Sequence, residues 1–93
     1  MIIIAGHSHW KTVVERDAAV AAFAAMIGQA RQQDGCIDMA ITADSLDPTR
    51  SNLFECWRDD QAWKGWQKVA KGPKVRALKR HVSLYRSDAA QTL

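Results

Sequence analysis

Apolar and polar positions change their period several times along the chain, and each change predicts a new element. Residues 1–10, "MIIIAGHSHW", begin with branched side chains and then alternate, which is typical of a strand. Behind Thr12, apolar residues recur every three or four positions as far as Ala30, so we expect one amphipathic helix over about residues 13–32. Thr12 and Glu15 have the spacing of a capping box at its start, and Gly35 suits its end.

The second half of the chain continues the alternation of strands and helices. Residues 36–44 and 51–58 predict two strands joined by the turn "SLDPTR". Residues 59–72 predict a helix, residues 73–80 a further helical turn or two, and residues 81–86 a last strand before a frayed tail over 87–93. The order β-α-β-β-α-β predicts a single α+β domain over residues 1–93. It is the ferredoxin-like split βαβ fold, a four-stranded antiparallel sheet with both helices on one face.

The register of the two central strands decides which side chains share a face. We expect Ile41 opposite Phe54 and Met39 opposite Cys56, all on the face that packs against the helices. The other face is then mixed, with these residues: Asp38, Ala40, Thr42, Leu53, Glu55 and Trp57. We also place His7 and His9 there. Apolar patches of this kind are seldom left exposed, so this face predicts a homodimer, and its polar groups predict a small-molecule pocket.

Composition and charge narrow the classes of function. The chain has 93 residues, 47% of them hydrophobic and 25% charged, which is ordinary for a globular domain. It has no apolar run long enough for a membrane span and no basic signal-peptide start, so we expect a cytoplasmic protein without a membrane partner. Cys36 and Cys56 form no metal or redox motif, and we assign them no chemistry.

Positive charge is concentrated near the C-terminal end. Eight Lys or Arg and no acid lie between Gln61 and Ser87. A solvated helix face explains this pattern, and attraction of an anionic substrate is the alternative. The pI of about 9.1 is only moderate, and Trp63 and Trp66 fit the buried stripe of a helix, so we expect no nucleic-acid partner.

The central segment "GCIDMAITADSLDPTRSNLFECWRDDQAW" resembles the antibiotic biosynthesis monooxygenase (ABM) family in its GC, DP and ExW motifs at matching spacings. Members of this family resemble one another in their architecture, a small dimeric α+β barrel. Several, the quinol monooxygenases among them, oxidise quinols, phenols or anthrones with dioxygen and no metal or flavin. The resemblance therefore implies a homodimeric, cofactor-free monooxygenase that acts on a small aromatic substrate. Asp34 replaces the usual Pro, Met39 replaces a common aromatic, and the second helix lacks a His often found there.

Cofactor-free oxygenation needs a base that ionises the substrate, and a histidine suits this role at neutral pH. We take His7 and His9 as candidate catalytic bases and Glu55 as the group that orients them. The remaining candidates are substrate-binding residues: Asp38, Leu53, Trp57, Trp66 and His81. A structural role for Glu55, bonded to Arg58 or to the partner subunit, is the alternative. His7 and His9 have the spacing of a metal pair on a strand, but no third ligand is evident, so we predict no metal.

Two other functions compete with the oxygenase. One is a dimeric binding or regulatory module of the same fold that has no turnover. The other is a haem-degrading relative. Enzymes of that kind resemble this fold but have an Asn on the first strand and a His at the end of the second helix, and this chain has His7 and Lys71 in those regions. Phosphate-binding and dinucleotide motifs are missing from the sequence, and so is a nucleophile elbow, which leaves nucleotide-dependent and hydrolase functions without support.

Overall fold

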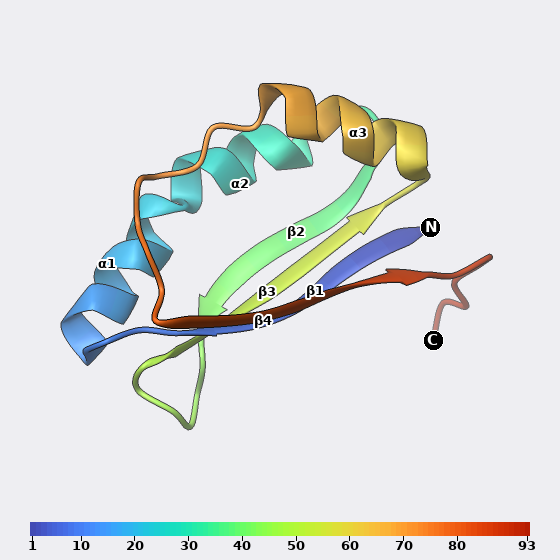
Figure 1. The fold of residues 1–93 in the computed structure, drawn as a ribbon. Coiled ribbons are helices and arrows are strands. Elements are labelled where there is room, and N and C mark those ends of the chain that lie inside the picture. Colours follow the sequence, from blue (N-terminus) through green and yellow to red (C-terminus); the bar gives the residue numbers. More distant parts are fainter.

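The computed structural model describes all 93 residues, and its elements follow one another in the order β-α-α-β-β-α-β. The strands are β1 (Ile2–His9), β2 (Cys36–Ala43), β3 (Arg50–Trp57) and β4 (Lys79–Arg86). The helices are α1 (Val13–Ala22), α2 (Ala24–Arg31) and α3 (Asp60–Val69). The strands form one antiparallel sheet in the order β2-β3-β1-β4. All three helices cover the same face, and the other face is bare (Figure 1). The predicted α+β, ferredoxin-like fold class is confirmed.

Side-chain caps define where the helices begin. The Thr12 hydroxyl accepts a hydrogen bond from the Glu15 amide at 3.1 Å, as the capping-box spacing predicts. The Asp59 carboxylate accepts one from the Ala62 amide at 2.8 Å and caps α3 in the same way. Both caps satisfy amide groups that have no partner inside the first turn of a helix.

The helix predicted over residues 13–32 is divided in two at Phe23, which corrects the prediction. The Phe23 amide still donates to the Ala19 carbonyl, and the Phe23 carbonyl accepts from the Ile27 amide, at 3.1 and 3.0 Å. The backbone therefore keeps a right-handed helical path while the axis changes direction (Figure 1). The division places the Phe23 side chain over the sheet, where it lines a cavity described below.

Residues 70–78, which we call the strap, join α3 to β4 across the helical side of the molecule (Figure 1). The helical turn predicted here is wrong: α3 ends at Val69, and Ala70 already has an extended backbone. Gly72 and Pro73 follow directly, and both disfavour continuation of a helix. The Leu78 amide donates to the His9 carbonyl at 2.8 Å, so pairing with β1 resumes before the predicted start of the last strand.

The core lies between the sheet and the helices, and it contains two of the four tryptophans. Trp57 and Met39 are almost fully buried, and Trp66 of α3 stacks on Trp57 with ring centroids 5.9 Å apart. Gly6 permits the close approach of β4, because a Cβ atom there would lie 1.9 Å from the His81 carbonyl oxygen. Gly35 has a positive φ of 82°, as expected where the chain leaves a helix.

Candidate active-site cavity

The register of β2 and β3 differs by one residue from the prediction, and this reverses the two faces of β3. Met39 lies opposite Glu55 and Ile41 opposite Leu53, with an irregularity between Cys36 and Asp38. Because side chains alternate along a strand, Leu53, Glu55 and Trp57 face the helices. Their predicted place on the mixed face is therefore wrong. Phe54 and Cys56 take that place instead.

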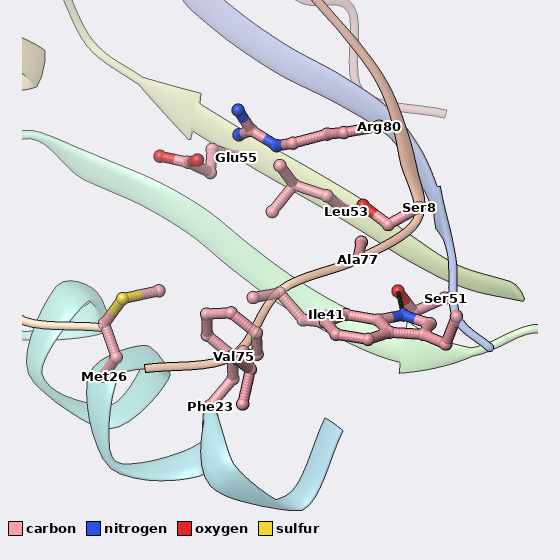
Figure 2. Close-up of a pocket in the computed structure, with 11 residues that line it drawn as sticks. Ser8, Phe23, Met26, Ile41, Ser51, Leu53, Glu55, Val75, Ala77 and Arg80 are labelled. Carbon is pink, nitrogen blue, oxygen red and sulfur yellow. Dashed lines mark hydrogen bonds between the residues drawn. The ribbon is translucent and has the colours of Figure 1, made fainter. Parts of the chain in front are cut away.

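A cavity of about 250 Å³ lies between this face of the sheet and the helices. Strands, helices and strap all contribute to its wall (Figure 2). The lining residues are Ser8, Trp10, Phe23, Met26, Ile41, Ser51, Leu53, Glu55, Val75, Ala77 and Arg80. Most of the wall is apolar, with a few polar groups from the strands, which is the usual character of a small-molecule site.

Glu55 is the carboxylate of this cavity. Its Oε1 accepts a hydrogen bond of 3.1 Å from Nε1 of Trp57, and the buried Trp57 ring holds that donor in place. Burial raises the pKa of the Glu55 carboxyl above its ordinary value, while the Trp57 hydrogen bond and the charge of Arg80 oppose the shift. The alternative of a bond to Arg58 is wrong, because Arg58 pairs with Asp34 and Asp59. A carboxylate with a raised pKa in an apolar cavity can accept a proton from a bound molecule.

A second hollow of about 430 Å³ adjoins the first beneath α3. The two share Met26, Glu55 and Arg80 in their walls, so we treat them as one two-lobed cleft. Trp63 and Trp66 line the second lobe, and Phe23 and Trp10 line the first. Aromatic side chains therefore line both lobes, which share one carboxylate and one guanidinium.

The other polar groups of the first lobe are more firmly held. Nε1 of Trp10 donates to Oγ of Ser51 at 2.9 Å, and both residues are buried. Figure 2 shows Ser8 and Arg80 on neighbouring strands, with the Arg80 side chain extended toward Glu55. The arrangement offers a proton acceptor, a cation and hydroxyl groups at one wall of an aromatic-lined space.

The three histidines of the chain gather on the bare face of the sheet, away from this cleft. The ring centroid of His7 lies 5.1 Å from that of His9 and 5.1 Å from that of His81. His7 and His9 are on the bare face, as predicted, but Glu55 is on the opposite face of the sheet. The prediction that Glu55 orients a histidine base is therefore wrong within one protomer.

The predicted substrate contacts are divided between several places. Leu53 lines the first lobe and Trp66 the second, while Trp57 is a core residue that contacts Glu55. Asp38 lies on the edge strand β2, where its carboxylate is 3.8 Å from Nε of Arg31. These positions favour Leu53 and Trp66 as substrate contacts over Asp38 and His81.

Several lining residues were missed by the sequence reasoning. Trp10, Phe23, Ser51 and Arg80 come from four different elements or their ends, so no local spacing links them. A weak signal existed for Arg80, because it belongs to the acid-free basic segment. Its direction toward Glu55 follows from the β1–β4 register, which the sequence alone does not reveal.

No group of three or more His, Cys, Asp or Glu side chains has an arrangement suited to a metal ion. We therefore assign no residue as a metal ligand. No helix is both long and apolar enough to cross a membrane.

Comparison with solved structures shows the same class of fold. A candidate antibiotic biosynthesis monooxygenase from Nitrosomonas europaea is 17% identical with a TM-score of 0.78, covering 96% of this chain and all of that one (100%). Rv0793 from Mycobacterium tuberculosis is 20% identical with a TM-score of 0.69, covering 98% and 97%. SO0527 from Shewanella oneidensis is 22% identical with a TM-score of 0.69, covering 90% and 88%.

The sequence profile that describes antibiotic biosynthesis monooxygenases matches residues 15–80, so the chain belongs to this family. The matched segment runs from α1 to the start of β4 and includes Glu55 and Arg80. A search among curated proteins found no match. The relationship to the antibiotic biosynthesis monooxygenase family, predicted from the GC, DP and ExW motifs, is confirmed.

Proposed function

We propose that this chain is a cofactor-independent monooxygenase that oxidises a small phenolic or anthrone-type substrate with dioxygen in the two-lobed cleft. The observation that carries the proposal is Glu55, a carboxylate with a raised pKa inside an aromatic-lined cavity. Membership of the chain in the antibiotic biosynthesis monooxygenase family supports the oxygenase chemistry. The aromatic side chains of both lobes suit a flat ring, and Glu55 lies where the two lobes meet.

The reaction requires no external reductant. Glu55 takes a proton from a phenolic hydroxyl or an activated CH₂ group, and the resulting anion is electron-rich enough to react with dioxygen. A carbon–oxygen bond forms, the peroxide anion takes the proton back from Glu55, and the hydroperoxide then loses water to leave a carbonyl. Both oxygen atoms are accounted for, one in the product and one in water, and the substrate supplies all the electrons. The apolar wall keeps bulk water from the anion.

The histidine base predicted from sequence is replaced in this proposal by Glu55. His7 and His9 lie across the sheet from the cleft, so neither reaches a substrate bound beside Glu55 in the same protomer. His7→Ala and His9→Ala variants test the catalytic role that the sequence predicts for these two residues. We expect both to keep oxygen uptake within about a factor of two, since a general base contributes about 10²-fold or more.

The test is oxygen uptake by the purified protein against a panel of quinols, naphthols and anthrones, with and without a chelator. We expect uptake with at least one electron-rich aromatic and no loss on exhaustive EDTA treatment. Loss that one metal restores would overturn cofactor independence. Tight binding of these aromatics with no uptake would favour the binding or regulatory module instead.

We also infer a homodimer that closes on the bare face of the sheet, in a cytoplasmic setting. Support comes from Phe54 and Tyr85, which are 40% and 55% exposed on that face, and from the resemblance to dimeric α+β barrels. Trp57, which the sequence predicts on this face, is buried in the core instead. Phe54→Asp is expected to yield monomers in light scattering, whereas Leu46→Asp, in the exposed β2–β3 loop, is expected to leave the dimer intact. A monomeric wild type at micromolar concentration would contradict the inference.

A further inference from the structure

The two-lobed cleft contains a cation that the protein itself does not neutralise. Five of the seven arginines pair with an acid within 4.0 Å, and Arg80 is not among them. Arg80 lines both lobes, and its guanidinium extends into the cleft beside Glu55 (Figure 2). Glu55 does not form an ion pair with it, and burial keeps the pKa of that carboxyl raised. An unpaired guanidinium at an apolar cavity is suited to an anionic group on a ligand.

The surroundings of Arg80 strengthen this interpretation. Lys71, Lys74 and Arg76 lie exposed on the strap, whose Val75 and Ala77 line the first lobe. No acid occurs in the sequence from Gln61 to Ser87, so the strap, the β4 side of the cleft and α3 after its first residue carry positive charge alone. Clustered charge of one sign raises the local concentration of an oppositely charged ligand and its rate of association.

We propose that the substrate is an aromatic acid, whose carboxylate is held by Arg80 while its reacting ring lies beside Glu55. This rests on the proposed function, since it names the substrate class of the same cleft. Arg80 offers a planar fork of N–H donors that matches a carboxylate, and the neighbouring aromatic walls receive the ring. One end of the ligand is thereby fixed against β4, and the ring is directed to the proton acceptor.

The experiment measures binding by calorimetry in the absence of oxygen, with naphthol and hydroxynaphthoate as a matched pair of probes. Wild-type protein is expected to bind hydroxynaphthoate about tenfold or more tightly than naphthol, because a charge-assisted hydrogen bond is added. Arg80→Gln is expected to remove the difference, and Arg80→Lys to retain part of it. Arg86→Gln is the matched control, since Arg86 lies on the same strand but pairs with Asp60. The preference is also expected to weaken with added salt.

Equal binding of the two probes by wild type, no binding of either, or a preference that survives Arg80→Gln would overturn the proposal. Arg80 is exposed, so the variant is expected to fold, and an unchanged circular dichroism spectrum checks this. The outcome is separable from the proposed function. A preference that depends on Arg80 without any oxygen uptake refutes the oxygenase and leaves the anion site standing. Oxygen uptake with neutral phenols alone supports the oxygenase and refutes the anion site.

Discussion

Trp57→Phe isolates the hydrogen bond that holds Glu55. The variant removes the Nε1 donor, which lies 3.1 Å from Oε1 of Glu55, and keeps an aromatic ring in the core. A hydrogen bond to a charged group contributes about 1.5–3 kcal/mol, and Glu55 is only partly buried, so we take the lower end. Since that bond favours the ionised carboxylate, its loss raises the pKa of Glu55 further.

The assay is the pH dependence of kcat/KM for oxygen uptake. The base acts in its ionised form, so the acid limb of the profile is expected to move upward by about one pH unit. Trp66→Phe is the matched control. It makes the ring stacked on Trp57 smaller, and Trp66 donates no hydrogen bond to Glu55. An unmoved acid limb in Trp57→Phe, or an equal shift in Trp66→Phe, would refute the assignment of Trp57 as the positioning residue.

Two further predictions concern the backbone and the bare face. Gly6→Ala is expected to lower the free energy of unfolding by about 3 kcal/mol or more in thermal melts, because the new Cβ meets the backbone of β4. Gly28→Ala is the control and is expected to stabilise the protein, because a Cβ there meets nothing within 4 Å. A Gly6→Ala variant more stable than Gly28→Ala would be inconsistent with this packing. Acidification from pH 7.5 to 5.5 is expected to weaken the proposed dimer about tenfold, because His7, whose ring lies 5.1 Å from two other histidine rings on the bare face, becomes charged. The pKa of His7 is already lowered, chiefly by desolvation and also by Arg50, while Asp44 opposes the shift, so this face disfavours the charged form of His7. A dimer equally stable at both pH values would refute the prediction.

The order of elements was predictable because each has a strong local signal. The Thr12 cap and the Gly35 helix end both appear where the residues indicate. The division at Phe23 and the extended strap were not predictable, since the first keeps helical hydrogen bonding and the second depends on contacts with distant residues.

The candidate site was only partly predictable, because the register of β3 is ambiguous in the sequence. Leu53, Phe54, Cys56 and Trp57 are apolar at both parities, so hydrophobic pattern alone does not fix the face. The sequence favours the bare face for Glu55, because a carboxylate is disfavoured in a core. The structure places it toward the helices, where a cavity and the Trp57 donor accommodate it. The rule that carboxylates are kept out of the protein interior is expected to fail at functional cavities.

The most direct test of the account compares kcat/KM for oxygen uptake in wild type, Glu55→Gln and Glu15→Gln. Glu15 is the other glutamate of the chain and lies on α1, outside the two-lobed cleft. Glu55→Gln keeps an acceptor for Trp57 but cannot take a proton, so we expect a loss of about 10²-fold or more with the fold intact. Glu15→Gln is expected to retain wild-type turnover. Oxygen uptake by Glu55→Gln within a factor of about two of wild type would contradict the central claim that this carboxylate is the base.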